Sequence, residues 1–72
     1  MATDGHGNKF VEFPMSDDES IRLTFVKQAA WVGTSTIRVQ KKTSTGRLAQ
    51  GPEFPSSLAG QFAKSLIELI GD

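Results

Sequence analysis

Two central segments of the chain alternate between apolar and polar residues with a period of two. Residues 20–28 have apolar side chains at Ile21, Leu23 and Phe25, and residues 34–42 have them at Ile37 and Val39. This period places alternate side chains on opposite faces of a β-strand. The pattern therefore predicts two strands, each with one apolar face and one polar face.

Weaker signals predict further elements around these strands. Residues 9–13 form a short apolar segment that Pro14 would end, and residues 47–50 form another that Gly51-Pro52 would interrupt. The polar segments 16–19 and 43–46 have turn composition. Residues 1–8, rich in glycine and polar side chains, are predicted to be a disordered tail.

A helix is predicted at the C-terminal end. Its apolar residues repeat at helical spacing, Ser56 or Ser57 could cap its start, and Gly71 is well placed to end it. The expected fold class is α+β: a small antiparallel β-sheet of three to four strands followed by one C-terminal α-helix. Residues 9–72 would form a single domain.

Length and composition restrict the protein further. The chain has 72 residues and no cysteine, so disulfides and thiolate zinc sites are excluded. A core this small rarely supplies more than about 3 to 5 kcal/mol of net stability, which leaves packing or self-association to stabilise the fold. Since no segment approaches the ~20 apolar residues of a membrane span, we expect an intracellular protein, cytoplasmic or nucleoid-associated.

Charge is unevenly distributed along a chain whose formal net charge is zero. Residues 20–52 contain no carboxylate but carry the basic residues Arg22, Lys27, Arg38, Lys41, Lys42 and Arg47. The even positions Arg22, Arg38 and Lys42 should share one face of the sheet. A hairpin centred near Ala30 would pair Leu23 with Ile37 and set Arg22 against Arg38.

Like charges directly opposite each other destabilise a strand pair. A phosphate between two guanidinium groups would instead accept charge-assisted hydrogen bonds from both. This arrangement indicates an anion-binding face, with Trp31 at its rim as a base-stacking side chain. Two plainer interpretations stay open. Trp31 could fill the core, and the basic residues could form an ordinary solvated surface.

The predicted helix has more apolar surface than one sheet face needs. Leu58, Phe62, Leu66 and Leu69 form a stripe that the sheet would cover, while Ala59, Ala63, Ile67 and Ile70 extend the apolar surface sideways. Either the rest of the domain covers nearly the whole helix, or the helix packs on a second copy of the chain or on another protein. We expect a homodimer through this helix, with Ala63, Ile67 and Ile70 at the interface.

Catalytic chemistry has few candidates in this sequence. The single histidine, His6, lies in the predicted tail, and the paired carboxylates Asp17-Asp18 lie in a predicted solvated turn. The phosphate-binding motifs GxxxxGK[ST] and GxGxxG are absent. We therefore expect no enzymatic activity, cofactor or metal site.

Three short motifs follow one another along the chain: Ile37-Arg38, Gly51-x-x-Phe54-Pro55 and Gln61-Phe62. In these motifs and their intervals, residues 21–70 resemble the positive cofactor four family of transcriptional coactivators. The chain departs from the family pattern at Val39-Gln40 and at Ala49-Gln50. The resemblance implies a homodimer that holds single-stranded DNA on its sheet and acts in transcription or its regulation.

The first hypothesis is thus a single-stranded nucleic-acid-binding domain, for DNA or RNA. Its interface would comprise Arg22, Lys27, Trp31, Arg38, Lys41, Lys42 and Arg47. Phosphate contacts and base stacking would make such binding salt-sensitive and tolerant of sequence. The alternative is a small regulator that binds an acidic protein surface on a large assembly, such as the transcription machinery.

Overall fold

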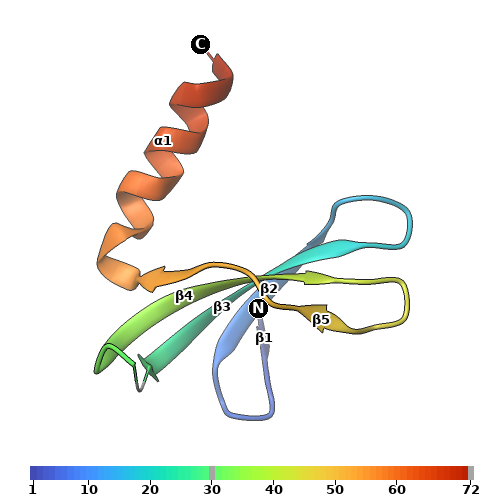
Figure 1. The fold of residues 1–72 in the computed structure, drawn as a ribbon, viewed down its shortest axis with the longest axis horizontal. Coiled ribbons are helices and arrows are strands. Elements are labelled where there is room, and N and C mark those ends of the chain that lie inside the picture. The colour runs from blue at the N-terminus through green and yellow to red at the C-terminus, as the bar shows by residue number, and fades with distance from the viewer. Residues whose placement is uncertain (30, 72) are drawn as a thin grey trace.

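The computed structural model describes residues 1–29 and 31–71. Within these residues, an antiparallel six-stranded sheet precedes one C-terminal helix (Figure 1), which confirms the predicted α+β class. The number of strands exceeds the predicted three to four. The strands and helices are β1 (Ala2–Thr3), β2 (Lys9–Pro14), β3 (Ser20–Ala29), β4 (Thr34–Lys42), β5 (Leu48–Ala49), β6 (Glu53–Pro55), the 3₁₀ turn η1 (Ser56–Leu58) and α1 (Ala59–Gly71).

The sheet follows chain order, β1-β2-β3-β4-β5, with β6 also paired to β4. β5 and β6 share one edge of β4: β5 pairs with Lys41 and Lys42, and β6 pairs with residues 36–38. The four predicted strands correspond to β2, β3, β4 and β5. The additional strands are β1 and β6.

The predicted disordered tail is wrong for most of residues 1–8. Ala2 and Thr3 form β1, which pairs with Phe10 and Lys9 of β2. The connecting turn is held by Asp4, whose Oδ1 accepts hydrogen bonds from the backbone N–H groups of His6 and Asn8, both at 2.9 Å. An aspartate that bonds to its own turn in this way is a recognised turn-forming device.

β6 was not predicted because Pro52 precedes it and Pro55 is its last residue. Pro52 has no backbone N–H to donate, but its carbonyl accepts a hydrogen bond from the backbone N–H of Val39 at 2.9 Å. The proline therefore still bonds to β4. The predicted serine cap is also wrong for η1, which has no side-chain cap hydrogen bond. Instead, the Ser56 hydroxyl pairs with that of Ser35.

The strand register of the central hairpin differs from the predicted one by two residues. Leu23 pairs with Val39, and Arg22 pairs with Gln40 instead of Arg38. The hairpin carries an irregularity between Val26 and Ala29 and a left-handed Gly33 with φ of +68°. Both faces keep the predicted side chains, but no two arginines lie directly opposite.

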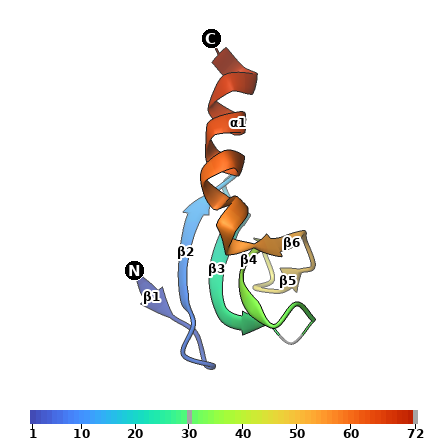
Figure 2. The same ribbon diagram turned by 90° about the vertical axis from the view of Figure 1, so that its left-hand side faces the viewer.

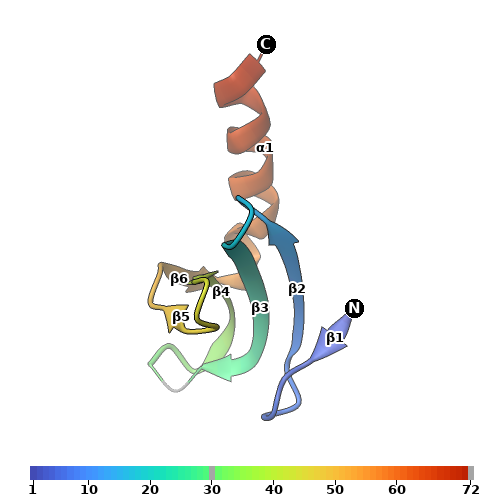
Figure 3. The ribbon, with the colours of Figure 1, turned by 90° about the vertical axis from the view of Figure 1, so that its right-hand side faces the viewer.

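The helix α1 leaves the sheet at β6 and projects away from it, so its C-terminal end lies far from every strand (Figures 2 and 3). Its main packing contact is the stack of Phe62 on Phe54, with ring centroids 4.8 Å apart. In the described part of α1 no residue is buried. The expectation that the sheet covers the stripe of Leu58, Phe62, Leu66 and Leu69 is therefore wrong. No helix in the described residues is long and apolar enough to cross a membrane.

The interior of one chain is small. Among the described residues, the buried side chains are Thr24, Val26, Ala29 and Thr36. Two of these four are polar, so few apolar groups are fully removed from water. A 72-residue chain without disulfides needs more apolar burial than this for stability.

Gly51 approaches the backbone of β4 more closely than any other residue type could. A Cβ atom built at this position would overlap the carbonyl oxygen of Val39, and a backbone group cannot move aside as a flexible side chain can. Gly51→Ala should therefore lower the free energy of unfolding by about 1–3 kcal/mol, the usual cost of overpacking. Urea unfolding at pH 7 would measure this.

The matched control is Gly60→Ala in α1, where an added Cβ meets nothing within 4 Å. This change should be neutral or stabilise the protein by up to about 1 kcal/mol, because alanine favours the helix over glycine. Equal stabilities for the two variants would contradict the close approach at Gly51.

Candidate nucleic-acid interface and apolar groove

The even-numbered side chains of β2, β3 and β4 form one face of the sheet, which we call the polar face. The strand register places Glu12, Arg22 and Gln40 in one row of this face, and Thr24 and Arg38 in another. Lys42 lies on the same face of β4, as the alternation of side chains requires. The predicted grouping of Arg22, Arg38 and Lys42 therefore matches the strand register.

Acidic side chains from elsewhere in the chain accompany the basic residues of segment 20–52 in the folded protein. Carboxylates from outside residues 20–52 reach four of the predicted basic residues in the folded chain. The ion pairs are Arg22–Glu12 at 2.6 Å, Arg38–Glu53 at 3.0 Å, Lys41–Glu19 at 3.4 Å and Lys42–Glu12 at 3.8 Å. Strand pairing places Glu12 and Glu53 beside these bases, and Glu19 comes from the β2–β3 turn, which the composition of segment 20–52 did not reveal.

Arg22 is held from two sides. Its Nε donates to Glu12 Oε2 at 2.7 Å, and its guanidinium carbon lies 4.0 Å from the centroid of the Phe10 ring. Cation–π stacking and a charge-assisted hydrogen bond both restrict the guanidinium. Phe10 thus belongs to the polar face despite its apolar side chain, which explains why residues 9–13 do not alternate cleanly.

Glu53 of β6 accepts hydrogen bonds from three donors on other elements. Oε2 accepts from Thr36 Oγ1 at 2.6 Å and from Trp31 Nε1 at 3.0 Å, while Oε1 accepts from Arg38 Nε at 3.0 Å. The hydrogen bond from Thr36, followed by those from Trp31 and Arg38, lowers the pKa of Glu53 from 4.5 to about 2. A carboxylate with these partners stays ionised and joins β4, β6 and the β3–β4 loop.

Trp31 is anchored but exposed. Its indole N–H is held by Glu53, yet 61% of the residue remains accessible to solvent. The interpretation of Trp31 as a core residue is therefore wrong. An indole ring fixed at one edge with much of its surface open offers a flat apolar platform beside Arg38.

The remaining predicted interface residues lie apart from this centre. Lys27 is exposed within the irregular end of β3, and Arg47 is exposed in the β4–β5 turn. Lys41 pairs with Ile21, so it lies on the opposite face of the sheet from Arg22. The structure thus gathers Arg22, Trp31, Arg38 and Lys42 on or beside the polar face, while Lys41 lies on the other side.

The odd-numbered face of the sheet and the first half of α1 enclose an apolar groove of about 760 Å³. Ala59, Phe62, Ala63 and Leu66 of α1 line it on one side. The sheet contributes side chains from four strands, among them Val11, Leu23, Phe25, Ile37, Val39 and Phe54. Of the predicted interface residues, Ala63 lines the groove, whereas Ile67 and Ile70 project outward with 71% and 88% exposure.

Sequence reasoning missed three members of the polar face: Phe10, Glu12 and Glu53. The alternation of side chains along β2 could have identified Phe10 and Glu12. Any register that pairs Val11 with Leu23 also places Glu12 beside Arg22 on the opposite face. No sequence signal pointed to Glu53, since its short strand follows Pro52 and ends at Pro55. Among residues 1–29 and 31–71 no group of three or more histidine, cysteine or acidic side chains could hold a metal ion.

Comparison with known proteins identifies no relative of this chain. No family model matches the chain, and neither the curated proteins nor the solved structures contain a significant match.

Proposed function

We propose that this protein is a non-enzymatic single-stranded nucleic-acid-binding domain that uses the polar face of its sheet. The observation that carries the proposal is Trp31, which is 61% exposed while Glu53 holds its indole N–H at 3.0 Å. Stacking a nucleotide base on such a ring is worth about 1–3 kcal/mol and does not depend on base identity. A single strand, unlike a duplex, leaves base faces free to stack.

The arginines and lysines near Trp31 supply contacts for phosphates. Arg38 shares Glu53 with Trp31, Arg22 and Lys42 lie further along the polar face, and Lys27 and Arg47 are exposed at its two ends. Basic side chains interleaved with aromatic ones are typical of proteins that bind single strands without sequence preference. The resemblance to transcriptional coactivators supports a role in transcription or its regulation.

Binding should be saturable, sensitive to salt and stronger for a single strand than for a duplex. The measurement is a titration of a labelled ~20-nucleotide strand and a matched duplex at two salt concentrations. Four phosphate contacts would give a slope of log K against log salt of roughly −2.8. Absence of binding at low salt, or equal binding of the duplex, would refute the proposal.

Trp31→Ala should weaken binding of the strand by about 5- to 150-fold, the equivalent of one stacked base. The control is Trp31→Phe, which keeps an aromatic face but loses the N–H donor to Glu53. If binding depends on stacking, the phenylalanine variant should retain most of the affinity. Equal losses in the two variants would instead assign the effect to the hydrogen bond and the loop that it holds.

A second part of the proposal is a homodimer in which each copy covers the apolar groove of the other. Each chain carries both the groove and the outward apolar residues of α1. In a twofold dimer, the α1 residues of each chain can cover the groove of the other, so both surfaces are buried. The exposed set on α1 includes Leu66, Ile67, Leu69 and Ile70. Few residues are buried in one chain, and this contact would supply the missing apolar burial.

The groove also favours a second candidate function, docking of an apolar segment from another protein. In that case the polar face would meet an acidic patch on the partner, with Arg22 and Arg38 as charged contacts. A monomeric chain that binds no single strand would favour this candidate.

A further inference from the structure

The carboxylate of Glu12 lies between two cationic side chains of the polar face. Its Oε2 is 2.6 Å from Arg22 Nη2 and 2.7 Å from Arg22 Nε, while Oε1 is 3.8 Å from Lys42 Nζ. Three neighbouring strands contribute one residue each, since β2 pairs with β3 and β3 with β4. The result is a cluster of two cations around one anion.

The two cations are arranged as they would be around a phosphate. Arginine presents the same N–H donors to a carboxylate and to a phosphate, and both anions accept them with similar geometry. The Phe10 ring, 4.0 Å from the guanidinium carbon, holds Arg22 in place independently of Glu12. The donors would therefore keep their position if the carboxylate were replaced by another anion.

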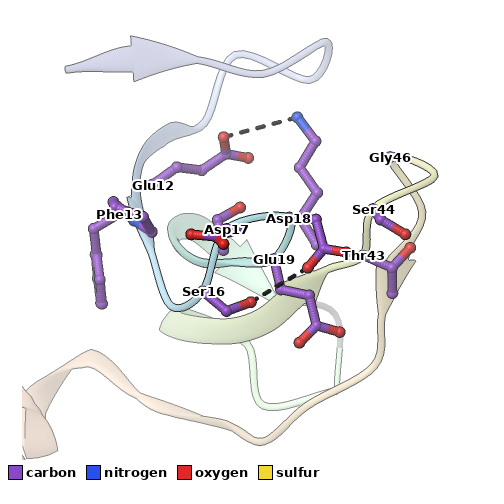
Figure 4. A pocket seen from close by; sticks show the side chains of 12 residues that line it. Glu12, Phe13, Ser16, Asp17, Asp18, Glu19, Thr43, Ser44 and Gly46 are labelled. Atoms are coloured by element: carbon purple, nitrogen blue, oxygen red, sulfur yellow. Dashed lines mark hydrogen bonds and ion pairs between the residues drawn. The ribbon is translucent and has the colours of Figure 1, made fainter.

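The cluster is partly accessible from solvent, since the side chains of Arg22, Glu12 and Lys42 are 18%, 27% and 39% exposed. Glu12 and Lys42, but not Arg22, line a cavity of about 470 Å³ between the β2–β3 and β4–β5 turns (Figure 4). The hydroxyl groups of Ser20, Thr43 and Ser44 also line it and can donate hydrogen bonds. An incoming phosphate would have to displace the Glu12 side chain to reach both cations.

The same cavity limits how much negative charge it accepts. Asp17, Asp18 and Glu19 line its other wall. These carboxylates repel an anion that extends across the cavity, so one phosphate group fits the cations better than a chain of them. In a nucleic acid this corresponds to one backbone phosphate.

We propose that Arg22 and Lys42 form a phosphate-binding subsite that the Glu12 carboxylate occupies in the free protein, so that ligand binding displaces Glu12. The inference rests on the proposed function for its source of phosphate, a single-stranded backbone, but the subsite can be tested on its own. Glu12 then weakens binding and raises selectivity, because only an anion that outcompetes the carboxylate is held.

The test compares Glu12→Gln with Glu68→Gln, which removes the same charge from an exposed position on α1. In NMR titrations with inorganic phosphate, Glu12→Gln should bind about 3- to 10-fold more tightly than wild type or Glu68→Gln, with the largest shift at the Arg22 Nε–H. Thermal unfolding of each variant would establish that the compared proteins are folded. Equal affinities in Glu12→Gln and Glu68→Gln would overturn the subsite.

A parallel titration with the ~20-nucleotide strand separates this inference from the proposed function. Tighter binding of both phosphate and strand by Glu12→Gln supports a subsite for backbone phosphate. Tighter binding of phosphate without any strand binding supports the subsite for free phosphate and refutes the proposed function. Strand binding that Glu12→Gln leaves unchanged relative to Glu68→Gln retains the proposed function and refutes the displacement of Glu12.

Discussion

In the proposed homodimer, Leu66→Asp should separate the two subunits. Leu66 lines the apolar groove on α1 and is 51% exposed in a single chain. Burial of such a side chain is worth about 1.5–3 kcal/mol, and a twofold interface contains it twice. The dimer dissociation constant should therefore rise by roughly 10²- to 10⁴-fold. Sedimentation equilibrium over a range of protein concentrations would measure the change.

Gln61→Asp is the matched control for this variant. It adds the same negative charge to the same helix, but on the polar side of α1, and Gln61 does not line the groove. The control should remain dimeric. Dissociation of both variants would show that added charge on α1 is enough to separate the subunits. A wild-type chain that is already monomeric would contradict the dimer and assign the groove to a different partner.

Glu53→Ala should produce the second large effect, a loss of about 2–4 kcal/mol in the free energy of unfolding at pH 7. The substitution leaves three donors without their acceptor, and one of them, Thr36, is 0% exposed. A fully buried hydroxyl group cannot replace the lost hydrogen bond with one to water. Urea unfolding would measure the loss, with Glu68→Ala as the control for removal of an exposed carboxylate.

The same carboxylate predicts a dependence of stability on pH. Its pKa is about 2 in the folded chain against 4.5 as the ordinary value, so the unfolded state binds the proton more readily. The stabilisation is fully present above about pH 5 and is lost as the pH falls toward 2. The difference in unfolding free energy between wild type and Glu53→Gln should thus be smaller at pH 3 than at pH 7. A constant difference would contradict the lowered pKa.

The sequence predicted the two central strands well because burial of one sheet face requires period-two alternation. Thr34–Lys42 was predicted with its observed bounds. The register was not predictable to the same degree. Alternation requires only that paired residue numbers have an even sum, and the geometry of the loop around Trp31 then decides between Ile37 and Val39 as the partner of Leu23.

The candidate site was less predictable than the fold. A segment without carboxylates indicates a basic surface only if no neighbouring strand supplies acids, and here β2 and β6 supply Glu12 and Glu53. The local run of bases in residues 20–52 therefore overstated the free positive charge. Trp31 could have been either buried or exposed, because one aromatic residue in a loop carries no periodicity.

The short outer strands of the sheet affect how copies of the chain can associate. β1 has two residues, and beyond it the free edge of β2 carries Glu12 and Pro14. On the other side β6 ends at Pro55. Short strands, charges and prolines at sheet edges oppose strand addition between chains, the route by which sheets grow into fibrils. Even at high concentration, therefore, association should stop at a closed pair of chains instead of extending without limit.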